Sequence, residues 1–427
     1  MDIPSIHHLF LKCNSVSTDT RKIEPNSLFV ALKGENFDAN TFAKEALSKG
    51  ASYVIIDNQD YYVDQRTILV KDSLTALQEL AKYHRNYLKI PIIALTGSNG
   101  KTTTKELINV VLSKKFKTKA TIGNLNNHIG VPLTLLSLHP AIEIGIVEMG
   151  ANHKKEIEFL CSLANPDFGY ITNFGKAHLE GFGGVEGVIQ GKSEMYEYIS
   201  ANDKIAFINN DDSIQVEKSK KMNYYSFGIN NSNANISISK IEANPFVTVS
   251  YLSLEIKTQL IGLYNANNVN AALTIGTYFG VDIKDIKEAL ESYIPENNRS
   301  QLITKGGNHI ILDAYNANPS SMSVAIENFI QLDQSNKVMI LGDMFELGSE
   351  SYQEHKTIVD LISKENQIVC YFVGYEFYAS KINKNGLIFH KTFETLAAEL
   401  KEIEFRNATL LIKGSRGMAL ERVLDYL

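Results

Sequence analysis

The stretch ALTGSNGKTTTKE, residues 94–106, constrains the fold of this chain more than any other. It lies between a short, branched apolar run at 90–95 and a run at 106–112 in which apolar residues return at helical spacing. The sequence therefore predicts a strand, a tight loop and a helix in that order. Such a loop can hold phosphate, because glycine lets backbone N–H groups turn inward and a helix N-terminus favours negative charge.

The side chains of this loop are those that a nucleotide requires. Lys101 can reach the outer phosphates, and the hydroxyl of Thr102 can bind magnesium. Leu95 stands where the usual pattern G-x-x-x-x-G-K-[ST] has its first glycine, so the match is shortened. The alternative is a chance loop whose threonines only cap the helix. The candidate nucleotide-binding residues here are Gly97, Ser98, Asn99, Gly100, Lys101, Thr102 and Thr103.

Composition narrows the class of protein. A chain of 427 residues is too long for one hydrophobic core, so roughly two to four domains are expected. The formal net charge of -6 indicates no broad basic surface, and we expect no nucleic-acid partner. No apolar run is long enough to span a bilayer, and the three cysteines lack ligand or redox spacing. We therefore expect a cytoplasmic protein.

Alternating strand and helix patterns predict three α/β domains. Residues 1–88 form a small N-terminal domain, 89–298 a central ATPase-like domain with a P-loop and a parallel sheet, and 299–427 a Rossmann-like domain. Within the central domain, the alternating polar stretch 236–261 predicts an antiparallel appendage. The main strands are expected at 27–32, 53–56, 90–95, 142–148, 168–172, 205–208, 310–312, 338–341, 369–373 and 410–412.

Polar residues follow two of the central strands. Glu148 ends one strand, where its carboxylate can hold magnesium, and Asn173 ends the next, with His178 just beyond. Ligands collect at the carboxyl ends of parallel strands, so these residues are candidates for the site. A single histidine is more often a core or surface residue whose ring nitrogens have ordinary hydrogen-bond partners. Only the proximity of Glu148 and the glycine loop favours a functional role for His178.

Lys192 is harder to interpret from chemistry alone. It can be a solvated helix lysine paired with Glu194 or another nearby acid. A cation that faces a magnesium ion would be unfavourable. If Lys192 faces the metal, it must be neutralised or converted into an anionic group.

Several motifs along the chain carry a resemblance to a known family. They are TGSNGKTTTKE, GNLNNHIGVP (123–132), VEMGA (147–151), ITNFGKAHLEGFG (171–183), GKSEMY (191–196), GLYNANNVNAA (262–272), YNANPSSM (315–322), LGDMFELG (341–348) and LIKGSRGMALE (411–421). With these motifs the chain resembles, over essentially its whole length, the ATP-dependent Mur ligases of bacterial cell-wall synthesis. Several of the motifs also occur in folylpolyglutamate synthases and therefore specify only the chemistry. The last-domain stretches YNANPSSM, LGDMFELG and KGSR resemble those of the family member that adds D-alanyl-D-alanine to a UDP-N-acetylmuramoyl-tripeptide.

The resemblance implies cofactors and roles. It implies ATP, two magnesium ions and a carbamylated lysine at Lys192, which turns the ammonium into an anion. Metal ligands would be Thr102, Glu148, His178 and Lys192, and catalytic residues Lys101, Lys192, His178 and Arg299. Further nucleotide contacts would be Asn265 and Asn268 near the adenine, Arg299 at the phosphates and Asp313 at the ribose. Substrate contacts would be Ser17, Asp19, Arg21, Asn126, Asn127, Asn173, Tyr315, Asn316, Asn318, Lys413, Ser415 and Arg416.

The implied reaction follows from carboxylate chemistry. A carboxylate is a poor electrophile, so ATP first converts it into an acyl phosphate, with Lys101 and magnesium stabilising the transferring group. The amine of the dipeptide then attacks the carbonyl carbon and phosphate leaves. Closure of the third domain would keep water from the intermediate, and Arg299 could couple nucleotide binding to that closure. The enzyme is expected to act as a monomer.

The sequence departs from the family pattern in two places. Thr20 replaces a usual serine, and Asp38-Ala39-Asn40 stands where Asp-Gly-His is common, which weakens the uridine assignment. Tyr264 occupies a common histidine position, so stacking on the adenine is expected there instead of hydrogen bonding.

Three other functions remain as alternatives. A folylpolyglutamate synthase would use the same intermediate with a folate acceptor, but the first domain and YNANPSSM argue against it. A non-catalytic nucleotide-binding protein would be favoured by loss of Lys101, Glu148, His178 or Lys192, and all four are present. A P-loop NTPase performing mechanical work would usually carry a magnesium-binding aspartate at a strand end and an arginine finger.

Overall fold

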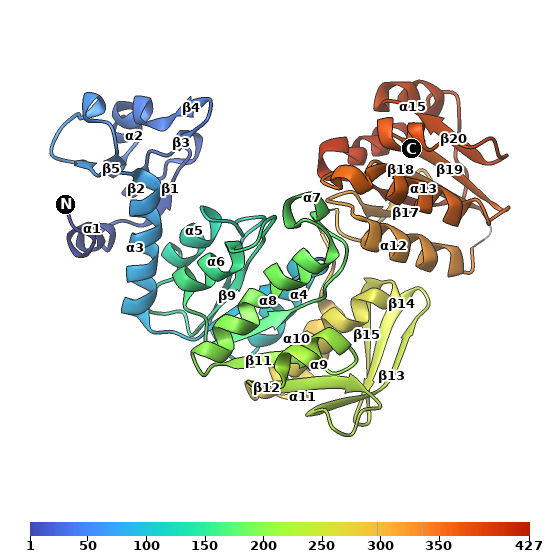
Figure 1. Cartoon of the computed structure of the whole chain (residues 1–427), viewed down its shortest axis with the longest axis horizontal. Helices are drawn as coiled ribbons and strands as arrows, with labels where there is room; N and C mark the ends of the chain where they lie inside the picture. The colour runs from blue at the N-terminus through green and yellow to red at the C-terminus, as the bar shows by residue number, and fades with distance from the viewer. Residues whose placement is uncertain (297, 335) are drawn as a thin grey trace.

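The computed structural model describes residues 1–427 except 297 and 335. Three sheets follow one another along the chain, each packed with its own helices, and Figure 1 shows the N-terminal, central and C-terminal parts in that order. These three large sheets have four, nine and six strands, and a small two-stranded sheet of β3 (Lys33–Gly34) and β4 (Phe37–Asp38) belongs to the N-terminal part. This arrangement confirms the predicted α/β class.

The N-terminal part is a small parallel sheet in the order β1-β2-β5-β6. Its strands are β1 (Ser15–Ser17), β2 (Ser27–Val30), β5 (Ala51–Ile56) and β6 (Thr67–Leu69), and its helices are α1 (Ile3–Phe10) and α2 (Ala43–Ser48). The long helix α3 (Ser73–Leu88) leads into the central part, where Arg85 lies buried and forms an ion pair of 2.8 Å with Asp167. Arg85 also donates to the carbonyl of Ala164, so this helix is fixed to the central part.

The central sheet places the phosphate-loop strand between the two strands that end in candidate site residues. Strand β7 (Ile92–Thr96) pairs in parallel with β9 (Ile144–Glu148) on one side and β10 (Phe168–Ile171) on the other. In these registers Leu95 lies opposite Glu148, and Thr96 lies opposite Ile171. The three strands therefore end at the same level, and the loops that follow them share one edge of the sheet.

The remaining central elements extend this sheet and cover it. Strands β13, β14 and β15 pair antiparallel, which confirms the predicted appendage, whereas β8 and β12 were not predicted. The additional strands are β8 (Thr118–Ala120), β11 (Ile205–Asn209), β12 (Asn223–Ile229), β13 (Ile236–Ala243), β14 (Phe246–Tyr251) and β15 (Leu254–Ile261). The helices are α4 (Lys101–Leu112), α5 (Gly130–Leu136), α6 (Glu156–Ala164), α7 (Leu179–Phe182), α8 (Val185–Ala201), α9 (Ser213–Ser219), α10 (Ala266–Tyr278) and α11 (Ile283–Ser292).

The C-terminal sheet has the order β16-β17-β21-β18-β19-β20 and is parallel except for β16, which pairs antiparallel at one edge. Its strands are β16 (Gln301–Lys305), β17 (Asn308–Asp313), β18 (Lys337–Gly342), β19 (Ile368–Val373), β20 (Leu387–His390) and β21 (Thr409–Lys413). The helices are α12 (Pro319–Gln331), α13 (Ser351–Ile362), α14 (Tyr375–Ala379) and α15 (Phe393–Leu400). The predicted doubly wound arrangement is confirmed, and the sheet contains two strands, β16 and β20, that were not predicted.

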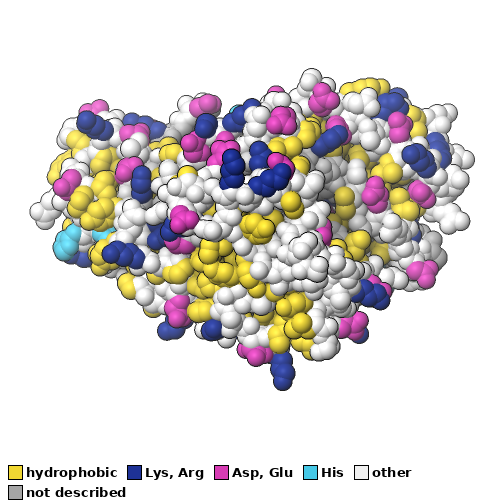
Figure 2. Space-filling model, turned by 60° about the horizontal axis from the view of Figure 1, so that its bottom comes forward, with side chains coloured by type: hydrophobic (Ala, Val, Ile, Leu, Met, Phe, Trp, Pro, Cys, Tyr) yellow, Lys and Arg dark blue, Asp and Glu magenta, His cyan; other side chains and the backbone are white. Residues whose placement is uncertain are grey.

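The surface agrees with the sequence composition. Figure 2 shows acidic and basic side chains interspersed over the face that it presents, with apolar side chains exposed between them. Each helix in the described part of the chain is too short or too polar to span a bilayer.

Candidate active site

A cavity of about 800 Å³ lies between the central and C-terminal parts. The ends of β7, β9 and β10 and the start of α4 form one wall, and the residues that follow β17 form the other. Of the residues predicted from the sequence, Ser98, Asn99, Gly100, Lys101, Thr102, Thr103, Asn126, Asn127, Glu148, Asn173, His178, Asn265, Asn268, Arg299, Asp313, Tyr315, Asn316, Asn318 and Lys413 line this cavity.

The loop at 97–100 has a defined conformation that specific contacts hold. Gly97 has φ +137°, and a Cβ there would lie 2.0 Å from the hydroxyl of Thr172, so only glycine fits. Asn173 clamps the loop, because its amide donates to the carbonyl of Asn99 at 3.0 Å and accepts from the Asn99 N–H at 3.1 Å. The residue before α4 is Gly100, and no side chain caps that helix. The threonines therefore do not cap this helix, and Thr104 instead donates to Asn268.

Lys101 folds back over the loop. Its Nζ donates to the carbonyl oxygens of Gly97 at 2.7 Å and Ser98 at 3.3 Å. Burial lowers the pKa of Lys101, the charge of Glu148 opposes that shift and the charge of Arg299 adds to it. An anion bound at the loop would contact both the Lys101 side chain and the N-terminus of α4.

Glu148 is buried at the end of β9, with 1% of its surface exposed. Its Oε1 accepts a hydrogen bond of 2.8 Å from the side-chain amide of Asn126. Its Oε2 is buried and has no hydrogen-bond partner among the described residues. An ionised oxygen without a partner is unfavourable, so this atom suits a bound cation.

Lys192 is also buried, with 1% exposed, so the solvated-helix interpretation is wrong. Its Nζ donates to the carbonyl of Ala151 at 2.9 Å and lies 4.9 Å from the ring centre of Phe182. Burial lowers the pKa of Lys192 well below its ordinary value, Lys101 adds to the shift and nearby carboxylates oppose it. Glu194 does not pair with Lys192, since it accepts backbone N–H groups at the start of α6. Lys192 is outside the cavity lining, although Ala151 belongs to it.

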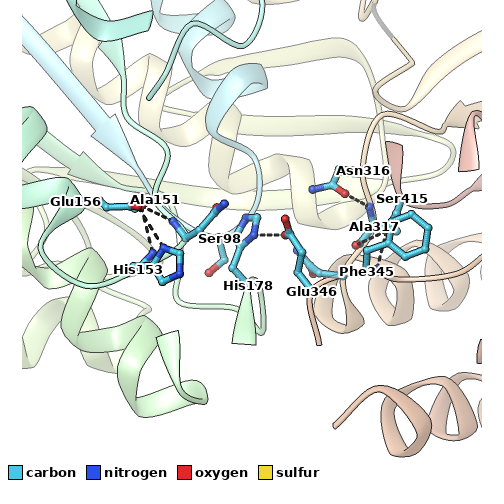
Figure 3. Close-up of polar contacts among 12 residues, drawn as sticks. Ser98, Ala151, His153, Glu156, His178, Asn316, Ala317, Phe345, Glu346 and Ser415 are labelled. Carbon is cyan, nitrogen blue, oxygen red and sulfur yellow. Dashed lines mark hydrogen bonds and ion pairs between the residues drawn. The ribbon is translucent and has the colours of Figure 1, made fainter. Parts of the chain in front are cut away.

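His178 lines the cavity and faces the C-terminal part. Its Nδ1 forms a short hydrogen bond with Oε2 of Glu346, as Figure 3 shows. Among the described residues no three His, Cys, Asp or Glu side chains converge on one metal position. A metal near Glu148 and His178 would therefore depend on ligands from the nucleotide or from other oxygen donors.

Asn265 and Asn268, which were predicted to lie near the adenine, form a hydrogen-bond chain with Thr104 of α4. Asn268 accepts from Thr104 at 3.0 Å and donates to Asn265 at 2.8 Å. A Cβ on Gly100 would approach Asn268 to 2.6 Å, so the amide packs directly against the loop. The hydroxyl of Tyr264 makes a hydrogen bond of 2.8 Å with Ser300, at the junction to the C-terminal part.

The C-terminal wall of the cavity contains the charged side chains of Lys413, Asp313 and Arg299. Lys413 pairs with Asp313 at 2.5 Å, and the guanidinium of Arg299 lies 3.6 Å from the ring centre of Tyr315. The amide of Asn318 donates to Asn99 of the phosphate loop at 2.7 Å, which joins the two walls directly.

Other predicted residues lie outside the cavity. Ser415 is buried and binds the backbone of Phe345, while Arg416 forms an exposed ion pair with Glu421. In the N-terminal part, Arg21 pairs with Asp19 at 2.8 Å and the hydroxyl of Ser17 donates to the Asp19 carbonyl. These three residues form a local cluster away from the cavity.

Some cavity residues were not predicted from the sequence. Asn152 precedes α6, Glu156 and Phe159 lie in its first turn, and Ser320 lies at the start of α12. Glu346 lay within the motif LGDMFELG, but nothing in its local pattern indicated a histidine partner in another domain.

Comparisons with known proteins agree with this architecture. Three family models match, described as Mur ligase family catalytic domain over residues 12–85, Mur ligase middle domain over 95–276 and Mur ligase glutamate ligase domain over 298–416. The UDP-N-acetylmuramoyl-tripeptide--D-alanyl-D-alanine ligase of Bacillus subtilis is 35% identical over 424 residues, which cover 97% of this chain and 93% of that protein.

Solved structures of Mur ligases are also similar to this chain over nearly its whole length. The crystal structure of MurF from Acinetobacter baumannii superposes with a TM-score of 0.86 at 29% identity, covering 99% of this chain and 97% of that one. MurF ligase from Thermotoga maritima in complex with ADP has a TM-score of 0.84 at 28% identity, covering 98% and 97%. With family models over all three sheets and a relative that aligns along nearly the whole length, the chain belongs to the Mur ligase family.

Proposed function

We propose that this chain is an ATP-dependent peptide ligase that adds D-alanyl-D-alanine to UDP-N-acetylmuramoyl-tripeptide through an acyl phosphate. The observation that carries the proposal is the cavity itself, which places the phosphate loop opposite a second wall that contains Arg299 and Lys413. Relatives with this named activity align along the whole chain, which supports the same substrates here.

We assign the nucleotide to the phosphate-loop wall. Lys101 would leave the loop carbonyls and bind the outer phosphates, where its charge stabilises the transferring phosphoryl group. Asn265 and Asn268 would lie on the adenine side and Asp313 at the ribose. Arg299, at the junction between the two walls, would bind phosphate from the other side.

The residues present fit magnesium, because the unpartnered Oε2 of Glu148 is an oxygen donor of the kind that this cation prefers. We assign Thr102, Glu148, His178 and Lys192 to two such ions. Magnesium, when bound, would neutralise negative charge that develops on the phosphates.

Carbamylation of Lys192 is part of the proposal. Burial favours the neutral amine of Lys192, and a neutral amine is the form that can attack carbon dioxide, forming an N–C bond and releasing a proton. The resulting carbamate oxygens would be anionic, which removes the conflict between this lysine and a nearby cation.

The reacting peptide would lie between the two walls. Its carboxylate oxygen attacks the γ-phosphorus of ATP, ADP leaves, and the amine of the dipeptide then attacks the carbonyl carbon and expels phosphate. Contacts such as Asn99 with Asn318 hold the walls together and limit water, which would hydrolyse the intermediate. We assign Asn126, Asn127, Asn173, Tyr315, Asn316, Asn318 and Lys413 to the peptide and dipeptide.

The remaining assignments complete the proposal. Residues 1–88 would bind the UDP group with Ser17, Asp19 and Arg21, residues 89–298 ATP, and residues 299–427 the dipeptide, with Ser415 and Arg416 near it. We propose a cytoplasmic monomer. The near full-length relatives from Bacillus subtilis, Rickettsia prowazekii and Escherichia coli carry the dipeptide-ligase name, which favours this function over the folylpolyglutamate alternative.

Phosphate release tests the function. The protein is incubated with ATP, magnesium, D-alanyl-D-alanine and a UDP-N-acetylmuramoyl-tripeptide whose third residue is either diaminopimelate or lysine. We expect release that requires both peptides and a product that contains both. Release that ignores the dipeptide would contradict the assignment.

A further inference from the structure

Two loops from different domains meet at one rim of the cavity. One loop carries His178, just before α7, and the other carries Glu346, which follows β18 (Figure 3). The side chain of Glu346 binds Nδ1 of His178, and its backbone carbonyl accepts from the N–H of Glu180 at 3.3 Å. Glu346 of the C-terminal part therefore contacts the central part through both its side chain and its backbone.

The backbone at this contact is unusual on both sides. His178 has φ +53° and Glu346 has φ +62°, and few non-glycine residues adopt such values. Gly348, with φ +55°, lets the loop come close, because a Cβ there would lie 3.2 Å from Cβ of Glu180. Residues in sparsely populated conformations are found at sites where the surrounding structure fixes a particular geometry.

The chemistry of the contact fixes the imidazole ring. A carboxylate can only accept a hydrogen bond, so Nδ1 of His178 carries the proton that the bond uses. The other nitrogen, Nε2, is then left for a further partner, and His178 lines the cavity. A carboxylate behind a metal-binding histidine commonly has this function of fixing the ring and its tautomer.

Other contacts hold the same two domains together. Lys176 pairs with Glu354 at 2.5 Å, and its backbone N–H donates to the hydroxyl of Ser320 at 2.8 Å. Docking of the C-terminal domain therefore does not depend on Glu346 alone. What Glu346 alone supplies, among the described residues, is a partner for the His178 ring.

We propose that Glu346 is a positioning residue that acts through His178. Its carboxylate orients the ring so that Nε2 faces the proposed metal position, and because Glu346 belongs to the C-terminal domain, this orientation comes with docking of that domain. The inference rests on the proposed function, since His178 is assigned there to a metal.

Metal binding tests the proposal without turnover. Mn²⁺ is titrated by electron paramagnetic resonance into the full chain with a non-hydrolysable ATP analogue, comparing wild type with Glu346→Ala, His178→Ala and the double variant. Alanine removes the acceptor, which glutamine would keep, so we expect Glu346→Ala to weaken Mn²⁺ binding about 10-fold or more, the usual effect of removing such a partner. The double variant should bind no more weakly than His178→Ala, because Glu346 acts through the ring.

The matched control is Glu350→Ala, an exposed acid four residues further along the chain, in the 3-10 turn before α13, which should stay within about twofold of wild type. Glu346 is half-exposed, so its replacement should leave the thermal unfolding midpoint close to that of wild type. Unchanged Mn²⁺ binding in Glu346→Ala, or a double variant that adds the two losses, would overturn the proposal. Failure of dipeptide-dependent phosphate release in wild type would instead overturn the ligase function, and the Mn²⁺ comparison does not use that assay.

Discussion

Replacement of Glu148 with glutamine should change stability and activity in opposite directions. The amide oxygen can keep the hydrogen bond from Asn126, so the packing is preserved. The change acts on the second oxygen, which is buried and has no partner among the described residues. In the protein without ligands this oxygen therefore has Lys101 as a nearby charge but no hydrogen bond from the described residues.

The change in the free energy of unfolding follows from a comparison of the buried carboxylate with the amide that replaces it. A buried ion without a partner costs several kcal/mol, whereas an unpaired neutral amide costs about 1–3 kcal/mol. Loss of the attraction between Glu148 and Lys101 offsets part of the difference. We expect a net gain of about 1 kcal/mol in the free energy of unfolding, which for a domain of about 150–250 residues raises Tm by about 2–4 °C.

The assay is urea unfolding followed by circular dichroism, without nucleotide or metal. The control is Glu402→Gln, which neutralises an exposed acid in the C-terminal domain and should leave stability unchanged. Phosphate release by Glu148→Gln should fall by about 100-fold or more, because a ligand for the cation is lost. A variant that is less stable than wild type, or that keeps full activity, would refute the reasoning.

Three further predictions concern separate features. Lys192→Ala should be nearly inactive in phosphate release and regain part of its rate with added acetate or formate, and normal activity would exclude a carbamate at this position. Arg299→Ala should lower turnover about 100-fold with little change in unfolding free energy, and an unchanged rate would remove its assigned role. Burial, and then the charge of His84, lower the pKa of His7 from 6.5 to about 4, so the folded protein holds this ring neutral. Stability is therefore complete above pH 6.5 and falls as the pH drops towards 4, by about 2 kcal/mol at pH 5, and the His7→Leu variant should show a smaller loss in urea unfolding across that window.

The sequence predicted those parts of the fold that leave a local pattern. The buried strands of the parallel sheets are continuous apolar runs, and each appears within a few residues of its predicted place, such as β9 and β18. Strands β8, β12, β16 and β20 were missed. Strands β8 and β20 have only three and four residues, and β12 and β16 mix polar with apolar residues, so none could be distinguished from a loop.

The site was predictable where one segment carries the chemistry and less so where two segments share it. The glycine loop and Glu148 follow from strand ends within a single domain. The contact between His178 and Glu346 joins residues 168 positions apart, and no periodicity encodes such a partner. Burial of Lys192 was also hidden, because a lysine on a mixed helix is more often solvated.

The central claim is that the peptide carboxylate is activated by phosphorylation, and the transfer of its oxygen tests this most directly. UDP-N-acetylmuramoyl-tripeptide labelled with ¹⁸O in the reacting carboxylate is converted with ATP and D-alanyl-D-alanine, and the released phosphate is analysed by mass spectrometry. The account predicts that each phosphate carries one oxygen from the carboxylate, because the C–O bond breaks when the amine attacks. Phosphate that carries no label, while dipeptide is joined, would contradict an acyl phosphate.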